Sequence, residues 1–200
     1  MDTLSLSIHQ REHKFHLLEA PDVQRRDLTN WLLVQLALDG PVHVMAGGNR
    51  YPAYAIHRLA RRCTSELETV LSRIRVARAF TCYQVHALLC DACMQPPAPR
   101  LVLDLLETFA DQNVPAWERS RLLHACLDRL QALAAQAPLL VSLRLPIPDA
   151  AQPWLAPLER AADCIWQLDS SPDPGVIIRP VAGRAVLRPE RRPPCQGKLF

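Results

Sequence analysis

Residues 42–62 read VHVMAGGNRYPAYAIHRLARR, and residues 74–89 read IRVARAFTCYQVHALL. In both stretches a short apolar run comes first, and a segment of helical period follows it after a turn. Short apolar runs are typical of buried strands, and strands that alternate with amphipathic helices predict a parallel sheet covered by helices. These two stretches therefore predict an α/β fold.

The same alternation extends in both directions along the chain. We expect strands at Lys14–Leu18, Val42–Met45, Ile74–Val76, Leu101–Leu105, Leu139–Leu143 and Cys164–Leu168. We expect helices at Asp27–Leu38, Tyr51–Arg62, Thr81–Ala92 and Ala116–Ala135. The proline-rich segments Gln95–Pro99 and Pro146–Pro157 are predicted to be surface loops.

The pattern of apolar residues changes after Cys164, where turn residues separate shorter apolar runs. Val176–Arg179 and Ala185–Leu187 are expected to form an antiparallel extension at one edge of the sheet. Residues 189–200 have no hydrophobic period and are predicted to be a flexible tail. We therefore expect one domain over residues 1–188, followed by this tail.

Composition narrows the class of protein further. The chain has 200 residues, 49% of them apolar, and a formal net charge of +3, which is typical of one globular domain and too small a charge to indicate a nucleic-acid partner. Charged residues or prolines interrupt every apolar run before the roughly 18 residues that a membrane span requires, so we expect no membrane association. Residues 1–13 lack the apolar stretch of a secretory signal, which favours the cytoplasm.

Lysine and glycine are scarce, and this excludes one large class of enzymes. The sequence has six glycines, and its only lysines are Lys14 and Lys198. The phosphate-binding loop GxxxxGK[ST] needs glycines for close backbone approach and a lysine for the phosphates. Neither lysine follows such a loop, so hydrolysis of ATP or GTP by that loop is excluded.

Several motifs occur in the order found in a known family. VARAF at Val76–Phe80, preceded by the stretch 42–62, resembles the core of the RecA/RadA recombinases, in which a strand with an acidic catalytic motif leads to a helix, a spacer and a V-A-R-A-[FY] strand end. RLVLDLLETF at 100–109 resembles the family's Walker B strand, and LLVSLRL at 139–145 resembles its later sensor strand. The segments from ADCIWQLD to RAVLRP resemble the closing strands.

This resemblance runs from Lys14 to Pro189. It implies a RecA-like three-layer sandwich, with a mostly parallel central sheet and an antiparallel C-terminal extension.

The phosphate-binding loop of the family is replaced in this chain. Its position reads EAPDVQRRD at residues 19–27, where the lysine position falls at Arg25 and the metal-binding hydroxyl at Arg26. The segment has no glycine, and Glu19 and Asp22 would repel a phosphate. The resemblance therefore implies a domain that has lost the motif for triphosphates.

The catalytic residues of the family are also replaced. The Asp-x-Glu position reads Ala46-Gly47-Gly48, and the sensor glutamine position reads Arg144. Asp104 alone keeps the family's residue, and we expect it to be a relic or to pair with a nearby arginine. The resemblance implies no catalytic residue, no cofactor and no metal, which makes the chain a pseudo-ATPase.

A domain of this kind is expected to act through its surface. The resemblance implies an accessory or scaffold protein in DNA repair, recombination or damage tolerance, such as the SOS response, with a RecA-like recombinase or a translesion polymerase complex as partner. One alternative is a nucleotide-binding enzyme with a rearranged site at Arg25, Arg26 and Asp104. A second alternative is a cell-division inhibitor built on the same degenerate core.

Two loops correspond to the stretches that touch DNA in the family. They are Phe109–Trp117 and Leu145–Trp154, and each contains one tryptophan on which a base could stack. The second loop has no basic residue and carries Asp149, so the attraction for a phosphate backbone is missing there. DNA contact through these loops is only weakly supported.

The segment Gln196–Phe200 resembles the QxxLF peptide by which bacterial repair proteins bind the sliding clamp. In such a peptide the Gln196 amide would form a hydrogen bond at the rim of a pocket, and Leu199 and Phe200 would fill it. The alternative is that Leu199 and Phe200 fold back on the domain.

Two further clusters admit two interpretations each. His86, Cys90 and Cys93 share a helix face and could ligate a metal, or the cysteines could pack as small apolar residues. The arginines around residues 58–78 could contact phosphate, or they could form a solvated face paired with Glu66 and Glu68.

Overall fold

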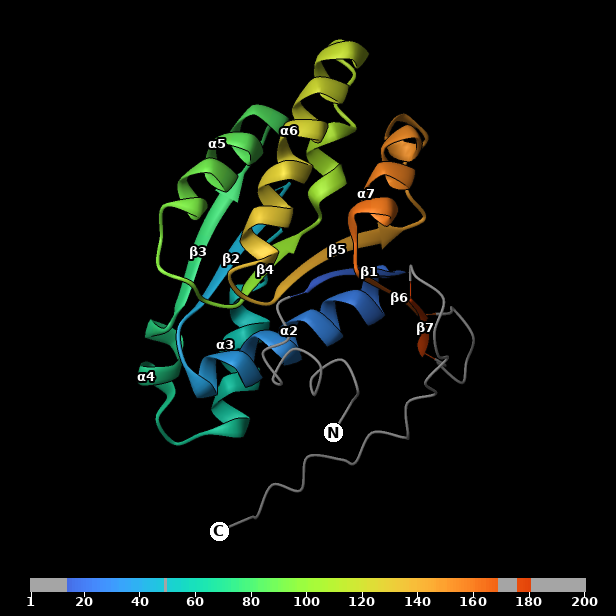
Figure 1. The fold of residues 1–200 in the computed structure, drawn as a ribbon. Helices are drawn as coiled ribbons and strands as arrows, with labels where there is room; N and C mark the ends of the chain where they lie inside the picture. Colours follow the sequence, from blue (N-terminus) through green and yellow to red (C-terminus); the bar gives the residue numbers. More distant parts are fainter. Residues whose placement is uncertain (1–13, 49, 169–175, 181–200) are drawn as a thin grey trace.

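The computed structural model describes residues 14–48, 50–168 and 176–180 (Figure 1). The strands are β1 Phe15–Pro21, β2 Val42–Gly47, β3 Ile74–Ala79, β4 Arg100–Leu103, β5 Leu139–Leu145, β6 Cys164–Leu168 and β7 Val176–Pro180. The helices are α2 Asp22–Asp39, α3 Ala53–Cys63, α4 Leu67–Ser72, α5 Cys82–Cys93, α6 Ala116–Ala134 and α7 Leu155–Ala161. Two short 3₁₀ helices are η1 Leu105–Phe109 and η2 Asp149–Trp154.

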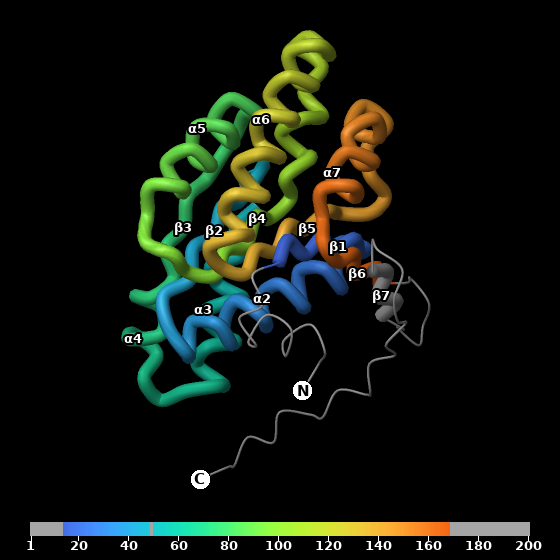
Figure 2. Tube along the Cα trace, in the orientation of Figure 1, coloured from blue at the N-terminus to red at the C-terminus, as the bar shows by residue number. Residues whose placement is uncertain are grey.

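The strands form one sheet in the order β3-β2-β4-β5-β1-β6-β7. Every pairing among β1 to β6 is parallel, and β7 pairs antiparallel with β6. Helices α2, α3 and α4 cover one face of the sheet, and α5, α6 and α7 cover the other (Figure 2). The predicted α/β fold with a mostly parallel sheet between two helical layers is confirmed. The other expected segment of the C-terminal extension, Ala185–Leu187, lies outside the described residues.

Strand β1 shows why the apolar runs in the sequence are continuous. Phe15 and Leu17 belong to the core under α5 to α7, whereas Leu18 and Ala20 belong to the core under α2 to α4. Because successive side chains of a strand point to opposite faces, a strand covered on both faces must be apolar at nearly every position.

The segment after β1 differs from the prediction. Residues 19–27 were expected to be a loop, but β1 continues to Pro21 and α2 begins at Asp22. The hydrophobic period used to place this helix starts at Leu28, because its first turn is polar. That turn includes Arg25, whose side chain is buried although it is charged. A polar first turn was therefore no sign that these residues lie in an exposed loop.

The proline-rich stretch Pro146–Pro157 also differs from the predicted surface loop. It forms η2 and the start of α7, and it buries Ile147 and Trp154 against the core. Pro157 lies in the first turn of α7, where its missing N–H breaks no helical hydrogen bond. Helix α4 was not predicted either, because six residues show too little of a helical period. No helix within the described residues has both the length and the apolarity needed to cross a bilayer.

Gly47 ends β2 at a point where two backbones nearly touch. A Cβ atom on this residue would lie 2.6 Å from the backbone oxygen of Asp104. Gly40 provides a contrast, because a Cβ atom there would meet nothing within 4 Å.

We predict that Gly47→Ala lowers the free energy of unfolding by about 2 kcal/mol, because the backbone of β2 or of residue 104 must shift. Gly40→Ala is the matched control and should change it by less than about 0.5 kcal/mol. Urea unfolding of both variants measures the difference. Equal stability of the two variants would contradict the close approach.

Candidate functional site

The residues that the motifs single out meet at the carboxyl ends of the parallel strands. Asp104 directly follows β4, Arg25 lies in the first turn of the helix after β1, and Arg144 lies near the end of β5. Strands β4, β5 and β1 are neighbours in the sheet. Open α/β sheets bind their ligands at this edge, so this is the candidate functional site.

Arg25 and Asp104 form an ion pair inside the protein. Arg25 Nη1 lies 2.8 Å from Asp104 Oδ1, and the two side chains are 3% and 2% exposed. No aligned hydrogen bond reaches Asp104 Oδ1, so the contact is one of charge. The expectation that Asp104 pairs with a nearby arginine is confirmed, and Arg25 is that arginine.

The backbone holds Asp104 in an unusual conformation. Its φ is 56° and its ψ is 41°, which is the left-handed region that few residues other than glycine adopt. Asp104 N–H donates a hydrogen bond to Ser142 O at 3.1 Å on β5, and Gly47 on β2 lies against the Asp104 carbonyl. Contacts from both neighbouring strands thus hold the carboxylate in place.

A second carboxylate binds the same arginine. Arg25 Nη2 donates to Asp22 Oδ1 at 2.8 Å, and Arg26 lies 3.3 Å from the other oxygen of Asp22. Burial acts to raise the pKa of Asp22, but the hydrogen bond from Arg25 and the charges of Arg26, Arg25 and Arg144 outweigh it and hold that pKa below its ordinary value. Asp22 therefore places a negative charge at the start of α2, where a helix favours an anion.

Asp104 has the opposite shift. Burial raises its pKa above the ordinary value, Glu107 raises it further, and the charge of Arg25 offsets these effects only in part. Asp104 is therefore a carboxylate for which ionisation is costly, and Arg25 is the partner that limits the cost.

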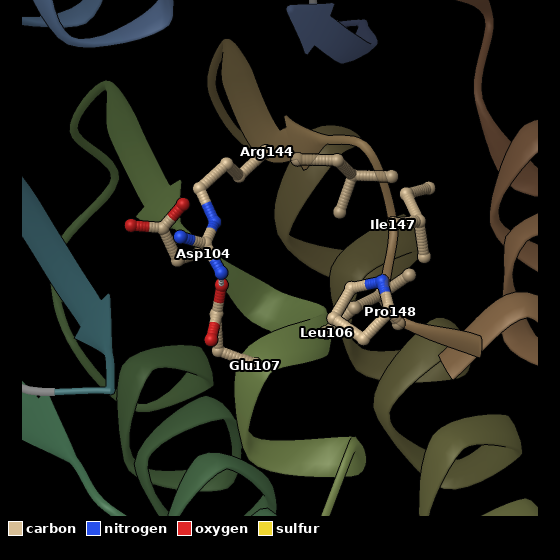
Figure 3. A pocket seen from close by; sticks show the side chains of 7 residues that line it. Asp104, Leu106, Glu107, Arg144, Ile147 and Pro148 are labelled. Atoms are coloured by element: carbon tan, nitrogen blue, oxygen red, sulfur yellow. Dashed lines mark ion pairs between the residues drawn. The ribbon is translucent and has the colours of Figure 1, made fainter. Parts of the chain in front are cut away.

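Glu107 and Arg144 close the outer side of the site. Arg144 Nη2 lies 2.7 Å from Glu107 Oε1, and both side chains are partly buried. They line a small pocket together with Asp104 and four apolar residues, Leu106, Leu143, Ile147 and Pro148 (Figure 3). The cavity volume is about 10 Å³, which holds roughly one water molecule. The enclosed part of this pocket is therefore much smaller than a nucleotide.

The connection between β1 and α2 bears on phosphate binding as well. The strand ends at Pro21 and the helix begins at the next residue. A phosphate-binding loop needs several consecutive backbone N–H groups that curve around the anion, and no residue lies between these two elements to form one. Arg25 is held by Asp22 and Asp104, so its charge is already balanced within the chain.

Of the two predicted tryptophan platforms, one is wrong. Trp154 is only 9% exposed, and the Arg119 guanidinium lies 5.9 Å from the centre of its ring, so no base can stack there without unfolding η2. Trp117 is 71% exposed at the start of α6 and remains available. The predicted partner residues Gln196, Leu199 and Phe200 lie outside the described residues.

The metal interpretation of the cysteines finds no support in the described part of the chain, where no three potential ligands gather around a common point. Cys90 Sγ lies 3.8 Å from His86 Nε2 on α5, without a third ligand. Burial raises the pKa of Cys126 on the facing helix to about 12. That thiol stays protonated and packs as an apolar side chain.

Sequence reasoning did not find the pairing of Glu107 with Arg144 or the contact of Asp22 with Arg25. The contact of Asp22 with Arg25 could have been predicted from the sequence, because residues three apart on a helix are neighbours. The pairing of Glu107 with Arg144 could not have been predicted, because the two residues follow or end different strands.

We predict that Arg25→Met lowers the free energy of unfolding by about 3 kcal/mol at pH 7, because it leaves the buried Asp104 carboxylate without its cation. The pKa of Asp104 then rises further above its ordinary value of 3.8. A buried carboxyl whose pKa is raised in the folded state is neutral at low pH, where it costs no stability. As the pH rises above the pKa of the unfolded state, the buried group lowers the free energy of unfolding. The destabilisation should therefore be smaller at pH 4 than at pH 7, as measured by urea unfolding.

Arg26→Met is the control for this experiment. Arg26 contacts the same Asp22, but its side chain is 50% exposed, so the change should stay within about 0.5 kcal/mol at both pH values. A loss in Arg25→Met that did not depend on pH would contradict the role of the Asp104 charge.

Comparison of the chain with models of known protein families and with curated proteins finds no significant match. The family resemblance suggested by the motifs stays a prediction.

Proposed function

We propose that the chain is a degenerate RecA-like domain that acts without catalysis, as an accessory or scaffold protein in DNA repair, recombination or damage tolerance. The observation that carries this proposal is the buried contact of Arg25 with Asp104. By the resemblance, these residues fall at the positions of the phosphate-binding lysine and the Walker B aspartate, and in this chain they form an ion pair with each other.

The spatial arrangement of the motif positions supports the RecA-like interpretation. Arg25, Asp104 and Arg144 were matched to the family from separate stretches of sequence, and they lie at the ends of three neighbouring strands. Residues that follow parallel strands meet at one edge of any such sheet, so what favours the interpretation is that β4, β5 and β1 are neighbours in the sheet. The glycines that replace the catalytic acidic motif lie at the same edge, with Gly47 against Asp104.

Exposed aromatic side chains support a role in contacts with other proteins. Phe80 is 58% exposed, Tyr83 48% and Trp117 71%. They lie at the end of β3 and in the first turns of α5 and α6, two helices that pack on each other. Aromatic residues of this size often contribute most of the binding energy of protein interfaces. We call these three residues the aromatic surface.

A RecA-like recombinase is the partner that we propose for this surface. A translesion polymerase complex remains the second candidate. The sliding clamp, bound through Gln196, Leu199 and Phe200, also stays a prediction, since these residues lie outside the described part of the chain.

We predict that the chain does not bind Mg·ATP more tightly than about 100 μM, because the enclosed part of the pocket is small and its cation is already paired. Titration with a fluorescent ATP analogue in the presence of magnesium measures this. Saturable binding tighter than about 100 μM would contradict the proposal and favour the rearranged nucleotide-binding enzyme.

We predict that the chain binds a bacterial RecA-type recombinase and that Trp117→Ala weakens this binding at least tenfold, which corresponds to about 1.4 kcal/mol. Met94→Ala is the matched control, because Met94 is 88% exposed at the opposite end of α5. Biolayer interferometry with the immobilised recombinase measures both variants. Binding to the division GTPase in place of the recombinase would favour the cell-division inhibitor.

A further inference from the structure

The exposed side of helix α3 is positively charged. Five of its six exposed residues, Tyr54, His57, Arg58, Arg61 and Arg62, lie within an arc of about 140° around the axis, because each residue advances a helix by about 100°. Ile56 and Ala60 point the other way and are buried against the core shared with α2. We call these five exposed residues the basic face of α3.

Within the described residues, no ion pair balances the arginines of this face. One of the two interpretations paired Arg58, Arg61 and Arg62 with Glu66 and Glu68, but no ion pair joins them in the part of the chain that the structure describes. Helix α3 itself contains no acidic residue. Helix α6 behaves differently, because its exposed Arg121 is held by Glu118 through two hydrogen bonds.

This arrangement does not help α3 to fold. Arg58 lies three residues before Arg61 and four before Arg62, and like charges at these spacings destabilise a helix by a few tenths of a kcal/mol. Arg61 and Arg62 lie in the last turn, where a cation is favourable. Arg58 lies outside that turn and has no such compensation. A ligand with negative charges would account for all three.

We propose that the basic face of α3 binds the phosphate backbone of single-stranded nucleic acid. The three arginines span about 6 Å along the helix, so their guanidinium groups can reach neighbouring phosphates of one strand. Tyr54 is 78% exposed one turn before Arg58, so its ring offers a face on which an unpaired base can stack. Cations for the backbone together with an aromatic ring for the bases are the features of single-strand binding surfaces.

This proposal stands apart from the recombinase contact, because it uses other residues on another element. The aromatic surface comes from β3, α5 and α6, whereas the basic face belongs to α3, which covers the opposite face of the sheet (Figure 1). An acidic segment of a protein could also meet three arginines and pack on the tyrosine ring, and the measurements with polyglutamate and with duplex DNA separate that partner from a single strand.

The test measures fluorescence anisotropy of a labelled oligo-dT of about 20 nucleotides at about 50 mM salt. The double variant Arg58→Ala/Arg62→Ala should weaken binding at least tenfold. Arg129→Ala/Arg160→Ala removes two exposed arginines from α6 and α7 and so changes the net charge equally; its affinity should stay within about twofold of the unsubstituted chain. Equal loss in both double variants would reduce the binding to a net-charge effect and overturn the proposal.

The salt dependence and the tyrosine provide independent measurements. Three phosphate contacts on a single strand predict a loss of affinity of about twentyfold between 50 and 200 mM salt, and the Arg58→Ala/Arg62→Ala variant should lose most of that dependence. Tyr54→Ala should weaken binding to the oligonucleotide about tenfold, whereas Tyr54→Phe keeps the ring and should retain it. Duplex DNA, whose bases are already stacked, should not respond to Tyr54→Ala.

Two results would overturn the proposal outright. One is the absence of oligonucleotide binding at low salt by the unsubstituted chain. The other is equally tight binding of polyglutamate, which would assign the face to an acidic protein. Because Arg58→Ala/Arg62→Ala leaves Trp117 in place, retained recombinase binding by this variant separates the failure of one proposal from the failure of the other.

Discussion

The buried ion pair between Arg25 and Asp104 is the central contact at the carboxyl edge of the sheet. It joins the helix that follows β1 to the end of β4, across the intervening strand β5. Each charge alone would be costly in the interior, so the two side chains depend on each other. The left-handed backbone at Asp104 and the close approach of Gly47 place the carboxylate where Arg25 reaches it.

This pair also engages two of the charged groups that a phosphate-binding site would need to have free. A triphosphate site needs a free cation, a free acidic group for a metal and a loop of backbone N–H groups. Here Arg25 is held by Asp104 and Asp22, Arg144 is held by Glu107, and β1 runs directly into α2. Since the charges at this edge bind one another, the contacts that we propose use the aromatic surface and the basic face of α3.

The differences between the predicted and the observed elements have a common cause. The interiors of the central strands were predicted correctly because both faces of the sheet are covered, which makes strands such as β4 and β5 nearly unbroken apolar runs. Errors arose where polar residues are buried or apolar ones lie among prolines. The first turn of α2 contains the buried Arg25, and the segment with Trp154 is rich in proline, so hydrophobic period alone misplaced both. The arginines of α3 are a similar case, because sequence shows their charge but not whether an acid lies beside it.

The sequence by itself determined that the chain is an α/β protein and that it has no glycine-rich loop followed by lysine. Both conclusions depend on local properties, namely the hydrophobic period and the identity of residues at fixed spacing. Only the tertiary structure decided that Arg25 binds Asp104, that Glu107 binds Arg144 and that Trp154 is buried. These contacts join segments far apart in the chain, and they follow from the order of the strands in the sheet, which no local pattern encodes.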